Sequence, residues 1–414
     1  MSEFEYVSLS NLVEEIIDNR GRTCPTSEQG IPLIATNCVK EDRIYPTHEK
    51  VRYVSDETYD EWFRGHPIPG DILFVNKGSP GRVCLVPDPI DFCIAQDMVA
   101  LRANKRLVCP QYLFAALRSP QVKASIDNMN VGTMIPHFKK GDFDKLLIPV
   151  PDRGEQESIG NIYYSFSLAI ENKRKTNETL EAMAKALFKS WFVDFDPVRA
   201  KAEGRPTGLP AEISDLFPDS FQDSELGEIP SGWKVEQLGE VIELAYGKPL
   251  KEEQRNGGSY PVFGSNGVVG SHDEYLVEAP GIVVGRKGNP GTVEWSEKNF
   301  YPIDTTFFVI KKKGGLGMRF LFYCLKNQNL SNLSADSAVP GLNRNHAYMN
   351  NQLLPPAEVA FAFERQLEVI FNRKAFLAEE INTLGATRDA LLPKLISGEI
   401  RIPDAEKMLE EVGV

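Results

Sequence analysis

The chain has 414 residues, of which 42% are hydrophobic and 25% are charged, and its formal net charge is -12. This composition is that of an ordinary globular protein and excludes a collagen-like, wholly disordered or disulfide-stapled chain, while the length predicts two or three domains. An acidic chain is a poor non-specific binder of nucleic acid, but the acidic excess lies mainly in residues 151–230 and 357–414. The other segments are close to charge balance, so local basic faces for DNA are not excluded.

The N-terminal sequence and the cysteines indicate in which cellular compartment the protein works. No run of 18 apolar residues occurs, and the acidic, polar start lacks the pattern of a signal peptide. The six cysteines form no CxxC pair, so neither a zinc site nor a disulfide framework is indicated. We expect a soluble cytoplasmic protein without membrane contact, whose cysteines are reduced and buried.

The chain contains an internal repeat with a shift of about 205 to 210 residues. KGSPGRV at 77–83 recurs as KGNPGTV at 287–293. Three more segment pairs and one matched aspartate follow in the same order: Asp97 with Asp304, YLFAALRS at 112–119 with FLFYCLKN at 320–327, IPHFKKGDF at 135–143 with VPGLNRNHA at 339–347, and LLIPVP at 146–151 with LLPPA at 353–357. Single Pro-Gly turns are common, but matched segments in one order predict a duplicated domain.

Residues 1–152 and 231–356 are predicted to be the two copies. Each contains short β-branched and aromatic runs bounded by Gly, Pro and Asn, and each contains one predicted helix, at 110–126 and 317–330. The fold class is therefore α+β, with two mixed α/β domains related by pseudo-two-fold symmetry.

Residues 153–193 and 357–400 are predicted to be two long helices that pack together as a coiled coil. Their seam positions, most of them apolar, recur every seven residues, with a second set four positions later. The seam residues are Ile159, Phe166, Lys173, Leu180, Leu187, Tyr163, Ile170, Asn177, Ala184 and Trp191 in the first helix, and Phe363, Ile370, Leu377, Leu384, Leu391, Leu367, Lys374, Ile381, Arg388 and Leu395 in the second. The alternative is an amphipathic helix on each globular core.

Two segments flank these helices. Residues 194–230 contain five prolines and a strong acidic excess, which predicts a linker. Residues 401–414 are predicted to be a C-terminal tail.

Several kinds of chemistry lack their motifs. No GxxxxGK phosphate loop occurs, and VFGSNGVVG at 262–270 is better explained by a hairpin turn than by a cofactor loop. The Asn/Asp-Pro-Pro-aromatic clamp of adenine methyltransferases is absent, and the five histidines form no HExxH motif. These absences predict a protein that binds and organises rather than an enzyme.

The most distinctive segments resemble a known family. LFKSWFVDFDPVRAKAEG at 187–204, IPSGWKVEQLGEV at 229–241 and LLPKLISGEIRI at 391–402 are similar to segments of the specificity subunits of type I restriction-modification systems. The resemblance implies two target-recognition domains that each read one half of a bipartite double-stranded DNA target. It also implies that the two long helices are antiparallel, separate these domains and set the spacer between the halves. It also implies two adenine-methyltransferase subunits and restriction/translocase subunits as partners. S-adenosylmethionine, ATP and Mg would be bound by those partners, with no cofactor, metal or catalytic residue in this chain.

The helix length gives an estimate of the spacer. A helix of roughly 38 residues would extend roughly 57 Å at ~1.5 Å per residue. Because DNA rises ~3.4 Å per base pair, the two half-targets would be separated by on the order of ten base pairs.

The candidate DNA-binding residues are polar and basic side chains in repeated loops. Arg, Lys, Asn and Ser are the groups that read base edges or anchor phosphates. The candidates are Lys77, Ser79, Arg286, Lys287 and Asn289 in the two KGxPG turns; His137, Lys139, Lys140, Asn343, Arg344 and Asn345 in the second loops; and Asn37 and Asn266, with Lys311, Lys312 and Lys313 as a possible phosphate contact. The alternative for each is an ordinary solvated loop.

Phe188, Trp191 and Phe192 form an aromatic patch at the end of the first long helix. They are the candidate docking surface for a methyltransferase subunit, and the alternative is the end of the coiled-coil core.

Two other functions are compatible with some of these patterns. A stand-alone sequence-specific DNA-binding scaffold or regulator would need no methyltransferase and no motor. A restriction enzyme with its chemistry in the same chain would need motifs that this sequence lacks.

Overall fold

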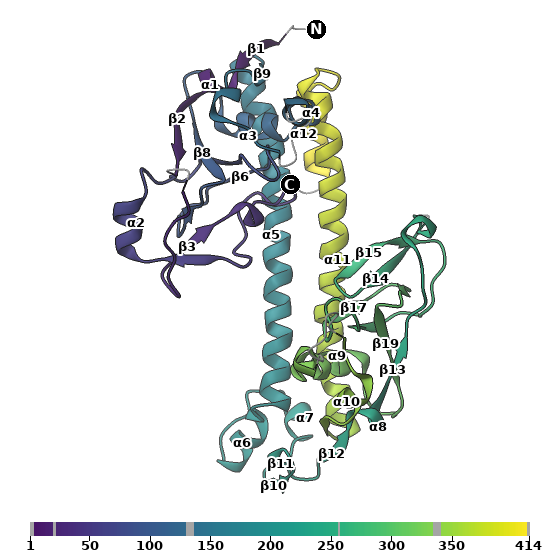
Figure 1. The fold of residues 1–414 in the computed structure, drawn as a ribbon. Coiled ribbons are helices and arrows are strands. Elements are labelled where there is room, and N and C mark those ends of the chain that lie inside the picture. The colour runs from purple at the N-terminus through teal and green to yellow at the C-terminus, as the bar shows by residue number, and fades with distance from the viewer. Residues whose placement is uncertain (1–3, 20–21, 130–135, 256, 334–340, 412–414) are drawn as a thin grey trace. The chain divides into compact units, whose positions relative to one another are not determined.

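The structure, a computed structural model, describes residues 4–19, 22–129, 136–255, 257–333 and 341–411. The chain divides into two compact units, the first formed by residues 1–176 and 377–414 and the second by residues 177–376. Each unit contains one mixed α/β lobe and part of each of the two long helices α5 and α11 (Figure 1). We call residues 4–152 the N-terminal lobe and residues 231–356 the C-terminal lobe.

The N-terminal lobe is built on a four-stranded sheet of order β2-β8-β5-β6, a three-stranded sheet β4-β3-β7 and a two-stranded pair β1-β9. Its strands are β1 (Glu5–Ser8), β2 (Val13–Asp18), β3 (Ile31–Ile34), β4 (Arg52–Val54), β5 (Ile72–Val75), β6 (Val83–Leu85), β7 (Cys93–Ile94), β8 (Met98–Ala103) and β9 (Leu147–Val150). Its helices are α1 (Leu9–Leu12), η1 (Thr36–Cys38), α2 (Asp56–Trp62), α3 (Pro110–Arg118), α4 (Pro120–Met129) and η2 (Lys140–Asp142).

The C-terminal lobe repeats this topology strand for strand, with the orders β13-β19-β16-β17, β15-β14-β18 and β12-β20. Its strands are β12 (Lys234–Gln237), β13 (Ile242–Tyr246), β14 (Tyr260–Gly264), β15 (Gly267–His272), β16 (Gly281–Gly285), β17 (Val293–Ser296), β18 (Tyr301–Pro302), β19 (Thr306–Lys311) and β20 (Asn351–Leu354). Its helices are α8 (Leu238–Val241), η3 (Glu252–Gln254), α9 (Met318–Asn327), η4 (Leu330–Leu333) and α10 (Arg344–Tyr348). The predicted duplication and the α+β class are therefore confirmed.

One detail of the predicted repeat was wrong by one residue. The carbonyl of Asp97 accepts hydrogen bonds from the amides of Asn76 and Lys77 at 2.9 and 3.3 Å. In the other lobe, the carbonyl that accepts from the equivalent amides of Arg286 and Lys287 belongs to Thr305, at 2.9 and 3.1 Å. Asp97 is thus equivalent to Thr305 and not to Asp304, because the segment between the turn and this strand differs in length by two residues in the two copies.

Each lobe has an apolar central strand buried on both faces. In β5, Ile72 and Phe74 face one hydrophobic cluster while Leu73 and Val75 face another. Side chains alternate across a strand, so a continuous apolar run is buried only where both faces are covered. The strand β16 is buried along its whole length in the same way.

The two long helices are α5 (Arg153–Phe192) and α11 (Ala357–Ile396), each of 40 residues. Most of the predicted seam positions are buried, among them Phe166 and Phe363, which are 0% exposed. The helices are antiparallel within each unit. In the first unit, Lys173 pairs with Glu380 and Ser167 with Arg388. In the second, Glu181 pairs with Lys374 and Trp191 contacts Phe363. The predicted pair of long antiparallel helices is confirmed.

Three of the polar seam residues, Lys173, Lys374 and Arg388, have polar partners across the helix pair. Lys173 Nζ lies 2.9 Å from Glu380 Oε1, and Lys374 Nζ lies 2.5 Å from Glu181 Oε2. Arg388 is 6% exposed, donates to Ser167 Oγ and Asp389, and stacks over the Tyr163 ring at 5.2 Å. Each pairing requires one specific register of the helices, which is how buried polar groups contribute to specificity.

The structure differs from the sequence predictions at three segments. Residues 194–230, predicted to be a linker, fold into α6 (Asp196–Ala202), α7 (Ala211–Ser214), β10 (Phe221–Ser224) and β11 (Gly227–Pro230). The reason is that Phe195, Val198, Phe217 and other apolar residues between the prolines are buried in the core of the second unit. The predicted tail contains α12 (Ile402–Glu411), and the predicted helix at 110–126 is split into α3 and α4 because Pro120 cannot donate a backbone hydrogen bond.

The six cysteines are free and buried, as predicted. Burial raises the pKa of the Cys84 thiol to about 12, which keeps the thiol protonated and unreactive. Within the part of the chain that the structure describes, no helix is long and apolar enough to cross a membrane. The same residues contain no group of three or more His, Cys, Asp or Glu side chains arranged to hold a metal ion.

The aromatic core of the second unit should dominate its stability. Trp191 is 1% exposed and lies 5.0 Å from Phe217 and 5.7 Å from Phe363, measured between ring centroids. We expect Trp191→Ala to lower the free energy of unfolding by about 3 to 5 kcal/mol in chemical denaturation, because the lost ring leaves a cavity. Phe361→Ala, at a residue of α11 that is 54% exposed, is the matched control and should change this free energy by less than about 0.5 kcal/mol.

Candidate nucleic-acid interface

The first candidate loop is the KGSPG turn that joins β5 to β6. Gly78 and Gly81 have φ of +87° and +84°, in the left-handed region that favours glycine. A Cβ on Gly81 would lie 2.8 Å from Ile126 Cδ1, so a side chain there would also press against the Ile126 side chain of α4. This tight turn leaves the Lys77 side chain exposed, with Ser79 half-buried beside it.

The second candidate loop lies against this turn. The amide of Phe138 donates to the carbonyl of Asn76 at 2.7 Å, and Asn76 Nδ2 donates back to the carbonyl of Phe138 at 2.9 Å. Lys77 and His137 form a β-bridge. Candidate residues about sixty positions apart in the sequence therefore share one surface, on which Lys77, Lys139 and Lys140 are exposed.

The C-terminal lobe makes the same junction. The amide of Leu342 donates to the carbonyl of Arg286 at 2.9 Å, and Lys287 forms a β-bridge with Gly341. Lys287 and Asn289 are exposed, while Arg286 and Arg344 are half-buried. The structure thus brings together the two candidate clusters that the sequence predicted separately.

Asn343 has a local structural task. Its Oδ1 accepts from the amides of Asn345 and His346 at 3.0 and 3.4 Å, which caps the N-terminus of α10. A side chain oxygen that caps a helix satisfies amides left without partners in the helix. The Asn343 oxygen is therefore occupied, although the residue is exposed, and Asn345 and His346 are exposed beside it.

Asn37 and Asn266 occupy equivalent places, three residues after the end of β3 and two after the end of β14. Their equivalence follows from strand register, because Leu33 pairs with Cys93 in one lobe as Val262 pairs with Tyr301 in the other. Asn266 lies beside the KGNPG turn. Thr292 Oγ1 donates to the carbonyl of Ser265, the residue before Asn266, at 2.8 Å, and to the carbonyl of Asn289 in the turn at 3.1 Å. Asn37 Nδ2 instead donates to the carbonyl of Glu49 at 2.6 Å.

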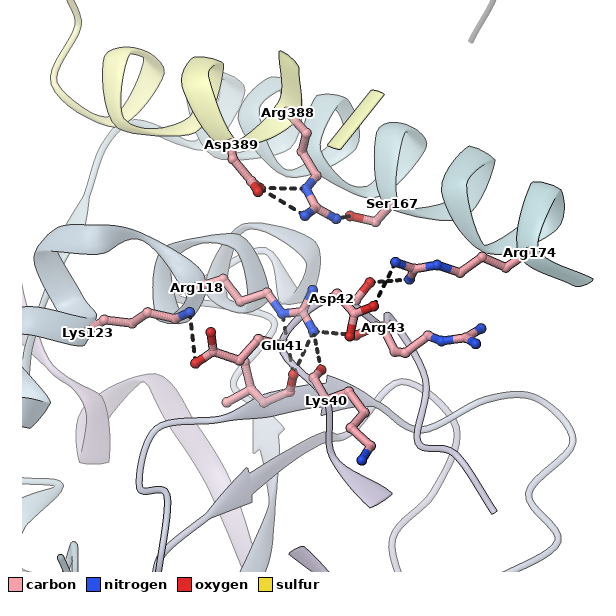
Figure 2. Close-up of polar contacts among 11 residues, drawn as sticks. Lys40, Glu41, Asp42, Arg43, Arg118, Lys123, Ser167, Arg174, Arg388 and Asp389 are labelled. Carbon is pink, nitrogen blue, oxygen red and sulfur yellow. Dashed lines mark hydrogen bonds and ion pairs between the residues drawn. The ribbon is translucent and has the colours of Figure 1, made fainter. Parts of the chain in front are cut away.

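The difference between these two asparagines comes from an insertion. Residues 35–51 connect β3 to β4, whereas residues 265–266 connect the equivalent β14 to β15. In the inserted loop, Asp42 Oδ2 lies 2.7 Å from Arg174 Nη2 of α5, and Glu41 lies 3.2 Å from Lys123 of α4 (Figure 2).

Arg118 fixes the inserted loop from inside. It is 7% exposed and donates to the carbonyls of Lys40, Arg43 and Val83. Figure 2 shows its guanidinium directed toward the loop that carries Lys40 to Arg43. Sequence reasoning did not single out Arg118. The signal was in the repeat, where a basic residue follows a phenylalanine by four positions in both copies, Phe114 with Arg118 and Phe322 with Lys326. In the structure each cation lies over its ring, at 4.7 and 4.5 Å.

The charged groups of the second loop are only partly compensated. The backbone amide of Lys139 donates to Asp142, and together with Lys145 it holds the pKa of that carboxyl below its ordinary value. Lys140 lies 3.7 Å from Asp18 at the end of β2. Neither contact involves the ammonium of Lys139, which remains exposed.

The three lysines at 311–313 form contacts within the chain. Lys311 and Lys312 donate to the carbonyls of Leu316 and Gly239, at 3.4 and 2.6 Å, and Lys313 pairs with Glu236. These contacts favour the structural alternative over a phosphate site for the run.

The aromatic patch at the end of α5 also belongs to the core. Phe188 and Phe192 are 7% exposed and Trp191 is 1% exposed, and all three pack edge-on or tilted against Phe363 of α11, with ring centroids 4.9 to 6.1 Å apart. A ring buried in its own chain offers little surface to a partner. The structure thus corrects the assignment of Phe188, Trp191 and Phe192 as a docking surface and supports the core alternative.

Comparison with known proteins agrees with this architecture. A family model described as "Type I restriction modification DNA specificity domain" matches residues 1–182 and 230–346. These two matched segments contain the N-terminal lobe, most of α5 and the C-terminal lobe as far as residue 346, and they cover more than half of the chain. The chain therefore belongs to the family of type I restriction-modification specificity subunits.

Individual relatives are distant. The chain is 26% identical over 402 residues to the type I restriction enzyme HindI specificity subunit of Haemophilus influenzae, covering 80% of this chain and 86% of that one. It is 23% identical over 360 residues to the MjaIX specificity subunit of Methanocaldococcus jannaschii, covering 81% and 78%. The crystal structure of the S subunit from M. genitalium has a TM-score of 0.57 at 17% identity, covering 95% of this chain and 97% of that chain, which supports the shared fold.

Removal of the Arg118 guanidinium should loosen the inserted loop. We expect Arg118→Met to lower the free energy of unfolding by about 1 to 3 kcal/mol, because it leaves buried carbonyls without donors. Arg153→Met, at an exposed i,i+4 pair with Glu157, is the matched control and should change it by less than about 1 kcal/mol. Equal effects of the two substitutions in urea denaturation would contradict the role of Arg118.

Proposed function

We propose that this specificity subunit reads a bipartite double-stranded DNA target, with one half of the target read by the joined loops of each lobe. One observation carries the proposal: in both lobes, a KGxPG turn is joined to a second polar loop by an equivalent backbone hydrogen bond. The amide of Phe138 donates to Asn76 in one lobe, and the amide of Leu342 donates to Arg286 in the other. Duplicated readers within one chain suit a target made of two separate halves.

The loop residues divide by chemistry into two tasks. Lys77, Lys139 and Lys287 are exposed ammonium groups, which suit phosphate anchoring. Ser79, Asn289 and Asn266 can both donate and accept hydrogen bonds, which suits base edges in the major groove. Sequence specificity would therefore come from the second set and salt-dependent affinity from the first.

The helices would set the distance between the half-targets. A helix of 40 residues is ~60 Å long at ~1.5 Å per residue. With DNA rising ~3.4 Å per base pair, a helix pair of this kind is long enough to impose an unread spacer on the order of ten base pairs.

The chain itself is proposed to be non-catalytic. The methylation of adenine would belong to two methyltransferase subunits that bind S-adenosylmethionine, and cleavage to restriction/translocase subunits that use ATP and Mg. This assignment rests on the family and on the absence of catalytic motifs from the sequence. We propose that the complex acts in the cytoplasm, where its DNA lies.

The function is tested by mapping methylated adenines in the genome of the source organism. Deletion of the gene for this chain should abolish methylation at one bipartite motif. Restoring the gene with seven residues inserted in each helix, after Thr176 and after Phe376, should lengthen the unread spacer of that motif by about 3 base pairs, since seven residues add ~10 Å and preserve the seam. Replacement of seven residues there without a change of length is the control.

An unchanged spacer in the lengthened variant would contradict the role of the helices while leaving DNA recognition intact. An unchanged methylome after deletion would contradict the function itself and would favour a stand-alone DNA-binding regulator.

The side of α11 opposite the seam is our proposed docking surface for one methyltransferase subunit. Phe361, Val369 and Phe376 are 54%, 72% and 53% exposed, and their spacing of eight and seven residues puts them on one face of the helix. Exposed apolar side chains grouped in this way are typical of protein interfaces. Repeat-equivalent positions of α5 carry Glu157, Ser165 and Asn172, so a second subunit would meet a more polar surface.

Val369→Asp should release one methyltransferase subunit, because a carboxylate in the centre of an apolar interface lacks a partner. We expect the number of methyltransferase subunits per tagged full-length chain, measured by native mass spectrometry of the purified complex, to fall from two to one. Leu107→Asp, at a loop residue that is 50% exposed, is the matched control and should leave two. Two bound subunits in the Val369→Asp complex would refute this docking surface.

A further inference from the structure

The last residue of β2 and the last residue of β13 occupy the same place in the two lobes but differ in chemistry. Asp18 pairs with Val99, and Tyr246 pairs with Phe307, at equivalent positions of the matching strands β8 and β19. Both residues lie beside the joined loops. The two copies of the reader therefore face their loops with a carboxylate in one lobe and an aromatic ring in the other.

In the C-terminal lobe, Tyr246 lies against two guanidinium groups. The Cζ atoms of Arg286 and Arg344 are each 4.8 Å from the centre of its ring, which is 50% exposed. Arg286 Nη1 also donates to the carbonyl of Asp304 at 3.0 Å, and Arg344 Nη1 to that of Leu244 at 3.3 Å. These two hydrogen bonds and the shared ring fix the direction of both side chains.

The two guanidinium groups keep their charge and most of their donors. Among the residues that the structure describes, no carboxylate forms an ion pair with Arg286 or Arg344. A guanidinium has five N–H donors, and the carbonyl contacts above use one of them in each residue. A ring face attracts a cation without neutralising it, so this arrangement orients two positive charges and leaves them available.

In the N-terminal lobe, the equivalent place removes charge instead. Asp18 lies 3.7 Å from Lys140, the counterpart of Arg344, and 3.4 Å from Arg64. The counterpart of Arg286 is Asn76, whose neutral amide is buried and bonded to the carbonyl of Phe138. The same position of the fold thus compensates a cation in one lobe and presents two cations in the other.

We propose that Tyr246 is a positioning residue that holds Arg286 and Arg344 as a clamp for the phosphate backbone of the half-target read by the C-terminal lobe, whereas Asp18 weakens the equivalent contact in the N-terminal lobe. The proposal deepens the function proposed above and rests on it. Phosphates are the ligand class because planar guanidinium groups with free donors match phosphate oxygens, and such contacts carry no sequence information.

The test is the salt dependence of DNA binding. Each phosphate neutralised contributes about -0.9 to the slope of log Kobs against log salt concentration. The probe is a duplex that contains the bipartite motif found by methylation mapping, and the protein is the complex purified through a tag on the full-length chain. Binding is measured between about 50 and 200 mM salt, the range over which phosphate contacts change affinity strongly.

Three substitutions are expected to change the salt slope in opposite directions or to leave it unchanged. Tyr246→Asp introduces the carboxylate of the other lobe and should make the slope shallower by about one unit. Asp18→Asn releases Lys140 and should make it steeper by up to one unit. Tyr246→Phe keeps the ring and should leave the slope unchanged, which separates the role of the ring from that of the hydroxyl.

Tyr6→Asp is the matched control, since it adds the same charge at a tyrosine that is 65% exposed on β1, outside the joined loops, and should not change the slope. Thermal unfolding of each variant checks that the fold is kept. A Tyr246→Asp complex with weaker binding but an unchanged slope, or with altered preference at one base pair only, would overturn the clamp. No binding of the motif by the unmodified complex would instead overturn the proposed function, and the clamp with it.

Discussion

The candidate interface depends on one backbone hydrogen bond that occurs twice. The amide of Phe138 meets the carbonyl of Asn76, and the amide of Leu342 meets the carbonyl of Arg286, at 2.7 and 2.9 Å. Each bond ties the turn between a central strand and an edge strand to a loop that precedes the final strand of its lobe. Together with the adjoining β-bridge in each lobe, this bond holds the two polar loops in one arrangement. This lowers the entropy cost of ordering their side chains at the moment of binding.

The turn can make this bond because the strand before it is rigid. β5 and β16 are buried on both faces, so their ends are fixed by packing and not by the loops. The glycines with positive φ then reverse the chain within a few residues, which leaves the preceding carbonyl directed at the second loop. The apolar core and the polar surface are thus parts of one arrangement, in which the core supplies the position and the turn supplies the direction.

The sequence was sufficient to predict what repeats along it. The shifted motifs predicted the duplicated lobes, and the seven-residue spacing predicted the paired long helices, because both patterns can be seen in the sequence itself. Long-range pairings were not predictable in this way. Tyr246 was not singled out, since Arg344 is nearly a hundred residues away, and the aromatic run at 188–192 could not be assigned to surface or core until Phe363 was found beside it. The proline-rich segment was misread because composition weighed more than the few apolar residues between the prolines.

The two lobes have diverged where the fold permits it. Strand order and the backbone junction are the same, since a change in either would disturb a buried strand. The connection after β3 spans residues 35–51 in one lobe, while its counterpart after β14 spans residues 265–266. In the longer connection, Asn37 donates to the carbonyl of Glu49, so its amide is not available to contact DNA in the way proposed for Asn266. The strand ends at Asp18 and Tyr246 differ just as freely, because a half-exposed side chain at a strand terminus contributes little to stability. A duplicated reader can therefore acquire two different specificities: its loops and strand ends vary while the junction that presents them stays constant.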